Sequence, residues 1–228
     1  MSARTAYIAA LPREIAPLVK GWRVEESLLA KGIFLYRQGS GIVASAGIGQ
    51  RRVALAVEAA LALGDVSQLT SVGVAGACDP ALAPGAVLRP STVVDSLTGE
   101  RFQAIRGDGS TLATIAVVAD SAEKSRLFAG YNAQLVDMEA AQVARMALQQ
   151  GLPFSALKSI SDAVDLALPD TMRFLSATGQ FKENAFALYL LPRPHLWRPV
   201  LKLARGSKLA IATLCEEIRR EISGEDLS

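Results

Sequence analysis

One stretch of the chain has the pattern of a strand–helix–strand unit, which limits the possible folds more than any other feature of the sequence. Gln134–Asp137 is typical of a short strand, and the apolar residues of Glu139–Gln150 have the spacing of one helix face. Gly151 ends that helix, and the run Phe154–Ile160 is apolar except for Lys158, as in a strand that is covered on both faces. This succession predicts an α/β fold.

Two acidic residues, Glu139 and Asp162, follow the two strands of this unit. Ligands of open α/β sheets bind beyond the carboxyl ends of the strands, so both acids are candidates for one pocket. A structural interpretation is also available, because an acid at a helix start meets the macrodipole favourably and Ser161–Asp162 is a common helix-capping pair. On the residues alone, the structural interpretation is the more common one.

The composition indicates one ordered globular domain. The chain has 228 residues, of which 50% are hydrophobic and 20% charged, and its net charge of +2 gives no general case for binding nucleic acid. Cys78 and Cys215 lie far apart and His195 is the single histidine, which excludes most zinc sites and serine triads. We therefore expect reduced thiols and no zinc site.

The first residues and the hydropathy bear on location. The apolar part of the N-terminal stretch is short and interrupted by Pro12, unlike a signal peptide. No apolar run reaches the length of about 18 residues that a membrane-spanning helix needs. The sequence predicts a cytoplasmic protein, with association at a membrane surface left open.

Several further elements are expected along the chain. Ala6–Leu11 is a predicted strand, followed by a helix that starts at Pro12 and holds Glu14 in its first turn, where the acid complements the helix dipole. The remaining expected elements are a hairpin of Ile33–Gln38 and Gly41–Ala46, strands at Leu69–Ala75, Ala86–Val94 and Leu112–Ala119, a lid or linker after Asp165, and a helix at Lys182–Leu191.

Glycines between a strand and a helix suggest an anion site after the hairpin. Gly47 and Gly49 precede a helical pattern that begins near Val53, and backbone amides at such a turn can face an anion. These glycines, with either Arg51 or Arg52, are a candidate site for inorganic phosphate as a co-substrate. A simple tight turn explains the glycines equally well.

The sequence VDMEA at residues 136–140, followed by SISDAVD at 159–165, resembles the purine nucleoside phosphorylase and nucleosidase superfamily, whose motif is V-E-M-E-A and then I-S-D. The branch it resembles contains methylthioadenosine/S-adenosylhomocysteine nucleosidases, futalosine hydrolase and hopanoid-associated phosphorylases. The resemblance runs from about Ala6 to about Arg173. It implies a single three-layer α/β domain with a central mixed, twisted sheet flanked by helices, and a homodimer. It also implies a reaction that needs no metal and no organic cofactor.

The resemblance also implies roles for individual residues. Asp162 would be the general acid that acts on the purine, with Ser161 holding it in place. Glu139 would accept hydrogen bonds from the ribose hydroxyls, and Met138 would pack on the sugar. Glu14, in AALPRE, matches the glutamate that activates water in the nucleosidases, or would lie beside phosphate in a phosphorylase.

The chain departs from the family pattern in two places. In GVAGA the family's hydroxyl residue is replaced by Val74, while Ala75 and Gly76, which line the sugar site, are kept. The family's aromatic segment that binds adenine is replaced by Ala122 and Glu123. Val74 removes one hydrogen-bond donor from the nucleophile pocket, and we expect base recognition to be looser or rebuilt at Ala122 and Glu123.

The last part of the chain is basic and amphipathic. We divide the chain into a main domain, residues 1–192, and an extension of the same domain, residues 193–228. Residues 193–208 contain five Lys or Arg and no acid, and their apolar residues predict a helix that begins no earlier than about Pro199. This helix either packs on the core with a solvated basic face or meets anionic lipid, with Trp197 near its start. The tail also resembles the hopanoid-associated phosphorylases, which are implied to act on adenosylhopane.

The predicted activity is cleavage of the N-glycosidic bond of an adenine nucleoside by water or phosphate, with adenosylhopane as one implied substrate. Methylthioadenosine, S-adenosylhomocysteine or futalosine is an alternative substrate. A non-catalytic nucleoside-binding or membrane-associated protein on the same fold is an alternative of another class. The expected partners are a small nucleoside and a second copy of the chain.

Overall fold

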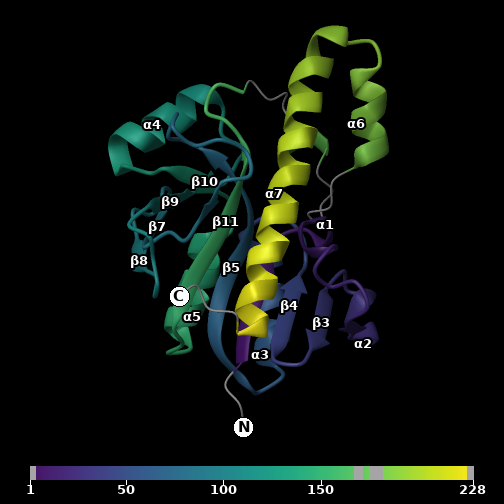
Figure 1. Ribbon diagram of the computed structural model, residues 1–228, viewed down its shortest axis with the longest axis vertical. Helices are drawn as coiled ribbons and strands as arrows, with labels where there is room; N and C mark the ends of the chain where they lie inside the picture. Colours follow the sequence, from purple (N-terminus) through teal and green to yellow (C-terminus); the bar gives the residue numbers. More distant parts are fainter. Residues whose placement is uncertain (1–3, 167–171, 175–181, 225–228) are drawn as a thin grey trace.

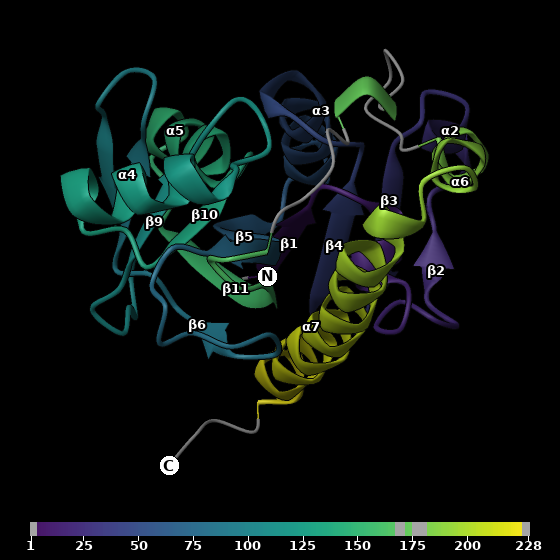
Figure 2. The same ribbon diagram turned by 90° about the horizontal axis from the view of Figure 1, so that it is seen from above.

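A central mixed β-sheet separates two helical layers in the computed structural model, which describes residues 4–166, 172–174 and 182–224. The helices α3 (Gln50–Leu61) and α5 (Ala140–Gln149) cover one face of the sheet, and α7 (Trp197–Ser223) crosses the other (Figures 1 and 2). The predicted three-layer α/β arrangement is therefore confirmed.

The remaining elements connect these layers. The strands are β1 (Arg4–Ala9), β2 (Arg23–Val24), β3 (Phe34–Gln38), β4 (Gly41–Ser45), β5 (Val66–Ala77), β6 (Val87–Leu88), β7 (Thr92–Asp95), β8 (Arg101–Gln103), β9 (Thr111–Thr114), β10 (Leu135–Asp137) and β11 (Phe154–Asp162). The other helices are α1 (Pro12–Ile15), α2 (Glu26–Leu29), α4 (Ser121–Tyr131) and α6 (Glu183–Leu190), with short 3-10 turns at η1 (Met172–Phe174) and η2 (Pro194–Leu196).

The long strand β5 organises the sheet, whose order is β2-β3-β4-β1-β5-β10-β9-β7-β8 with β11 also paired to β5. β11 runs parallel to β5, with Asp162 opposite Gly76, whereas β10 runs antiparallel to β5, with Val136 opposite the same glycine. The carboxyl ends of β10 and β11 therefore meet beside one residue of β5. This register, which brings two distant segments together, creates the site.

The predicted strand–helix–strand unit is confirmed as β10, α5 and β11. β11 is buried along nearly its whole length, as expected for a strand covered on both faces. The side chain of Lys158 is buried within it. Cys78 and Cys215 also lie buried, as free thiols.

Two expected strands differ from the structure. Ala86–Val94 is two short strands, β6 and β7, because Pro90 lies between them and lacks the N–H that a strand interior donates. The strand expected at Leu112–Ala119 ends at Thr114, and the residues after it form a wall of the pocket described below. The hairpin of β3 and β4 is confirmed.

Helix α7 begins two residues before the predicted limit, at Trp197. Pro199 is tolerated because the first N–H groups of a helix have no partner within the helix. The C-terminal half of α7 packs on the sheet, through buried residues such as Leu214 and Ile218. In its N-terminal half the side chains of Trp197 and Leu201 are exposed. The structural alternative for the tail therefore applies to the C-terminal half of this helix.

The lid or linker expected after Asp165 lies mostly outside the described residues, which resume at η1 and α6. In the part of the chain that the structure describes, no helix combines the length and apolar character needed to cross a membrane.

Candidate active site

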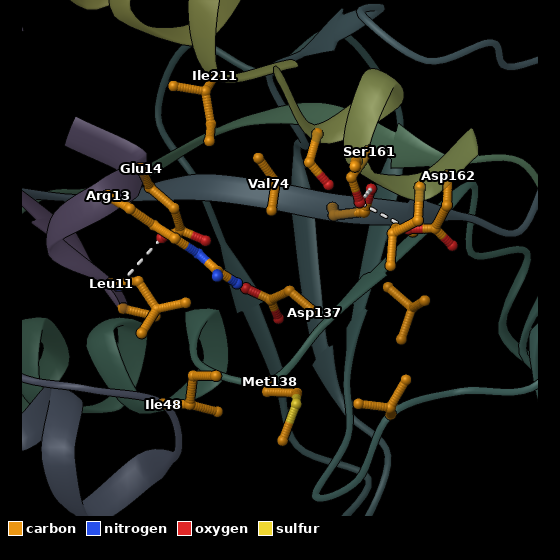
Figure 3. A pocket seen from close by; sticks show the side chains of 18 of the residues that line it. Leu11, Arg13, Glu14, Ile48, Val74, Asp137, Met138, Ser161, Asp162 and Ile211 are labelled. Carbon is orange, nitrogen blue, oxygen red and sulfur yellow. Dashed lines mark hydrogen bonds between the residues drawn. The ribbon is translucent and has the colours of Figure 1, made fainter. Parts of the chain in front are cut away.

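A pocket of about 790 Å³ opens where the sheet faces α1, α6 and α7. Its polar side is formed by side chains at the ends of separate elements (Figure 3). Glu14 and Asp162 lie on opposite sides of the view, with Val74 between them. The predicted site residues that line this pocket are Glu14, Val74, Ala75, Gly76, Met138, Glu139, Ser161 and Asp162.

Glu14 reaches the pocket from the short helix that follows β1. Its Oε2 accepts a hydrogen bond of 3.2 Å from the backbone N–H of Leu11, which fixes the carboxylate at the helix start. Gly73 has φ of +148° and leaves room for this group, since a Cβ there would lie 3.3 Å from the same oxygen. Burial raises the pKa of Glu14 above its ordinary value.

Glu139 stands at the start of α5, but its side chain does not cap that helix. Its Oε1 instead accepts a hydrogen bond of 2.9 Å from the backbone N–H of Gly49. Burial, and secondarily the neighbouring carboxylate of Asp137, raise the pKa of Glu139 to about 8. The side chain of Glu139 is therefore held by the turn before α3, although the residue stands at the start of α5.

Asp162 ends β11 and is held from two sides. Its Oδ1 accepts a hydrogen bond of 2.6 Å from Ser161 Oγ, the contact that the family resemblance implied. Its Oδ2 accepts a hydrogen bond from the buried ammonium of Lys124, on α4. Residues 164–165 form a turn, so Ser161 and Asp162 do not cap a helix.

A second buried ion pair includes Asp137, which lines the pocket. Lys158 Nζ is 2.9 Å from Asp137 Oδ2 and donates a hydrogen bond of 3.0 Å to Ser71 Oγ. Asp137 also accepts hydrogen bonds from Thr114 Oγ1, at 2.7 Å, and from the backbone N–H of Ala140, at 3.0 Å. A fully hydrogen-bonded buried ion pair of this kind holds β10, which ends at Asp137, against β11, which contains Lys158.

Sequence reasoning missed three of these charged residues as parts of the site. Asp137 stands inside the motif VDMEA but was given no role, and Lys158 was noted only as an interruption of an apolar strand. A lysine within a strand that is covered on both faces must find a buried partner, and this was the available signal. Lys124 lies in a helix of mixed polarity and gave no comparable signal.

The glycines predicted to bind phosphate have other partners. The backbone N–H of Gly47 donates to the carbonyl oxygen of Ala10 at 2.8 Å, and that of Gly49 donates to Glu139. Neither glycine lines the pocket. Their amides therefore position β1 and Glu139 instead of facing an anion.

The two arginines of the predicted phosphate site also point elsewhere. Arg52 donates to the carbonyl oxygens of Ala46, at 2.6 Å, and Gly32, at 3.0 Å, and Arg51 is exposed. Neither lines the pocket, whereas Arg13 does. The geometry gives no support to the phosphate site predicted from charge.

The two residues at the family's base-recognition position lie outside the pocket. Glu123 pairs with Arg126 on the surface of α4, its backbone N–H is capped by Asp120 at 2.8 Å, and Ala122 is exposed. Neither Ala122 nor Glu123 lines the pocket. The residues of this region that do are Ile115, Val117, Val118, Ala119 and Lys124.

The other side of the pocket is apolar and is built by the helices that follow β11. In Figure 1, α6 lies beside the N-terminal half of α7. These two helices contribute mainly apolar lining side chains, which are Phe186, Leu190, Val200, Leu203, Ala204, Ile211 and Ala212. The pocket therefore joins a charged floor to an apolar extension.

Comparison with known proteins gives a consistent assignment. A family model described as the phosphorylase superfamily matches residues 4–108 and 106–190. No curated protein sequence matches the chain significantly.

Solved structures share the fold at low identity. A methylthioadenosine/S-adenosylhomocysteine nucleosidase of Helicobacter pylori, a mutant with 5'-methylthioadenosine in its active site, is 18% identical, with a TM-score of 0.71 over 99% of this chain and 100% of the other. A futalosine hydrolase of the same organism is 18% identical, with a TM-score of 0.70 over 98% of each chain. A 5'-methylthioadenosine nucleosidase of Arabidopsis thaliana is 19% identical, with a TM-score of 0.70 over 98% of this chain and 97% of the other.

Proposed function

The chain belongs to the phosphorylase superfamily, and we propose that it cleaves the N-glycosidic bond of an adenine nucleoside in the pocket described above. It is an enzyme of the nucleoside phosphorylase and nucleosidase class. The observation that carries the proposal is the convergence of three buried carboxylates, those of Glu14, Glu139 and Asp162, on one pocket from three separate segments. A protein that only binds nucleosides would have little use for all three.

Each carboxylate meets a different need of the reaction. Cleavage leaves positive charge on the ribose and negative charge on the base, and both must be stabilised in the transition state. Asp162, held by Ser161, would neutralise the base. Glu139, with Met138 beside it, would hold the ribose hydroxyls and favour the cationic sugar.

We propose water as the nucleophile, positioned by Glu14. The nucleophile side of the pocket holds Glu14 and Glu139, and the ionised forms of these acids, which the proposed reaction requires, would repel a phosphate dianion. Val74 offers no hydroxyl donor to an anion there, and Arg51 and Arg52 lie outside the pocket. A buried carboxylate with a raised pKa is suited to take a proton from water.

Phosphorolysis is the second candidate, and one observation favours it. Arg13 lines the pocket next to Glu14, where a guanidinium would suit a phosphate oxygen. In that case inorganic phosphate would be a co-substrate, and the sugar product would be a ribose 1-phosphate.

The proposed reaction and its nucleophile can be tested together. We would incubate the protein with methylthioadenosine, S-adenosylhomocysteine and adenosylhopane, each with and without phosphate, and quantify adenine by chromatography. Release that does not depend on phosphate supports hydrolysis, and release only with phosphate supports phosphorolysis. No release from any nucleoside under either condition would count against glycosidic cleavage.

The apolar extension of the pocket supports a substrate with a large apolar group at the five-prime position. Leu190, Leu203 and Ile211 would lie along that group, and the burial of each such side chain contributes to binding. The polycyclic lipid of adenosylhopane has this character. Methylthioadenosine, S-adenosylhomocysteine and futalosine carry smaller or more polar groups and are the alternatives.

A charge placed in the apolar extension is expected to separate these substrates. In Leu203→Glu, kcat/KM should fall roughly 10-fold or more for adenosylhopane, because an ion would face the lipid, and should change little for unsubstituted adenosine. Leu209→Glu, at an exposed residue of the same helix that does not line the pocket, is the matched control. Equal losses for both nucleosides in Leu203→Glu would argue against an apolar five-prime group.

The pH dependence should reflect Glu139. In the proposed reaction its carboxylate accepts hydrogen bonds from the ribose hydroxyls. Below the pKa of Glu139, about 8, the carboxyl group is protonated and one of its oxygens no longer accepts a hydrogen bond. We therefore expect kcat/KM to rise with pH through about 8 and to level off above it. The raised pKa of Glu14 acts in the same direction, since only its ionised form can accept a proton from water. Glu139→Gln should have a lower kcat/KM and should lose the part of this rise that Glu139 causes, and an unchanged profile would contradict the assignment.

Two further proposals concern association. Exposed apolar side chains gather around the turn from α6 to α7, at Leu188, Leu191, Trp197 and Leu201, beside the exposed base Arg198. This combination supports peripheral contact of a cytoplasmic protein with anionic lipid. Homodimerisation stays a prediction from the family resemblance.

A further inference from the structure

We infer that Lys124 supplies, through Asp162, the proton that the departing base receives. The inference rests on the proposed function and assigns a role to a residue that the sequence motifs do not include. Lys124 lies on α4, lines the pocket and is 1% exposed. Its ammonium donates to Asp162 Oδ2 and, at 3.0 Å, to the carbonyl oxygen of Ala163.

Two features of the surroundings of Lys124 hold its side chain in contact with Asp162. A Cβ at Gly76 would lie 3.1 Å from Lys124 Cε and 3.2 Å from Asp162 Oδ2, so only glycine leaves both groups unhindered. Asp120 caps the start of α4 and thereby fixes the helix that carries the lysine. A lysine that only balanced charge at the surface would need none of this.

Among the residues that the structure describes, Asp162 is the carboxylate that faces the ammonium of Lys124. Asp162 contacts it from β11. Cys78 lies nearby, but burial raises the pKa of its thiol to about 12, so it stays neutral. Glu123, on the same helix, pairs with Arg126 on the surface. The acid that the ammonium of Lys124 contacts is therefore Asp162.

The arrangement of hydrogen bonds shows why Asp162 needs this partner. Asp162 receives two donors, the hydroxyl of Ser161 on Oδ1 and the ammonium of Lys124 on Oδ2. A carboxylate in that state only accepts, and it cannot give a proton to the base. The proton available in the pair is on Lys124.

The proposed step moves one proton and breaks one bond. As the bond from the ribose carbon to the purine nitrogen breaks, its electron pair goes to the base. Lys124 passes a proton to Asp162 Oδ2, and Asp162 gives it to the imidazole nitrogen of the base. The lysine is left neutral, the aspartate is again a carboxylate, and the proton released by the attacking water can restore the ammonium.

The test compares two leaving groups on the same ribose. Adenine needs a proton to depart, whereas p-nitrophenolate is a stable anion that does not. In Lys124→Met we expect kcat for the adenine nucleoside to fall by about 10²-fold or more. The p-nitrophenyl riboside with the same five-prime group should lose far less. Lys124→Arg separates charge from proton supply, because an arginine keeps the positive charge but does not give up its proton, and it should behave like Lys124→Met.

Each outcome bears on a defined claim. Arg126→Met, which removes a surface cation of the same helix, is the matched control and should leave both substrates unaffected. Equal losses for both leaving groups, or full activity in Lys124→Arg, would overturn the proton-supply role while leaving glycosidic cleavage intact. If the wild-type protein cleaves neither substrate, the proposed function itself fails.

Discussion

Replacing Asp162 with asparagine is expected to lower kcat for adenine release by about 10²–10⁴-fold, the range typical of a removed general acid. The amide keeps the shape of the carboxyl but cannot pass a proton from Lys124 to the base. Nucleoside binding should persist, because the groups proposed to hold the ribose, such as Glu139, are untouched. Adenine chromatography and calorimetric titration of the nucleoside would measure the two quantities separately.

The substitution also leaves a buried ammonium without its counter-ion, so folding must be checked. Breaking a buried ion pair costs about 3–5 kcal/mol. The double variant Asp162→Asn with Lys124→Met removes the unpaired charge, and it should recover stability without recovering activity. Asp165→Asn is the matched control, since its side chain is 75% exposed. Near-normal kcat in a folded Asp162→Asn protein would contradict the proposed role.

The substitution Gly206→Ala is expected to lower the free energy of unfolding by about 1–3 kcal/mol, although alanine is the better helix former. Gly206 lies in α7 where this helix meets β11, and a Cβ there would collide with the carbonyl oxygen of Ser161. Relief of the clash requires α7 or the end of β11 to move. Because Ser161 holds Asp162 and α7 lines the pocket, activity should fall together with stability.

The matched control is the same substitution at another helical glycine. Gly130 lies in α4, and nothing stands within 4 Å of the Cβ that alanine would add. Gly130→Ala should be neutral or stabilising by up to about 1 kcal/mol. Chemical denaturation of the two variants measures the opposite signs directly. Equal changes in the free energy of unfolding of the two variants would show that contact with Ser161 does not prevent a side chain at residue 206.

The sequence predicted the parts of the fold that depend on local periodicity. The strand–helix–strand unit from β10 to β11 followed from apolar spacing, and its strand ends located Glu139 and Asp162. Prediction failed where a single residue overrode the pattern, as Pro90 does between β6 and β7. It also failed where a helix start tolerated a proline, as α7 does at Pro199.

The site was predicted only in part, because several of its side-chain contacts join residues that are distant in sequence. Lys124 and Asp162 meet through the register of β5, β10 and β11, which no local pattern contains. The charge of Arg52 suggested an anion site, but its guanidinium donates hydrogen bonds to backbone carbonyl oxygens. A charge in a sequence does not say which way its side chain points.

The most direct test of glycosidic cleavage is a single turnover with the wild-type protein in excess over adenosylhopane, in water enriched in a heavy oxygen isotope. Adenine and sugar would be separated after an acid quench, and the sugar analysed by mass spectrometry. We expect each bound nucleoside to yield one free adenine and one sugar that carries the heavy oxygen. A nucleoside that binds and is recovered intact, both in this buffer and after phosphate is added, would contradict this account and indicate a binding protein on the same fold.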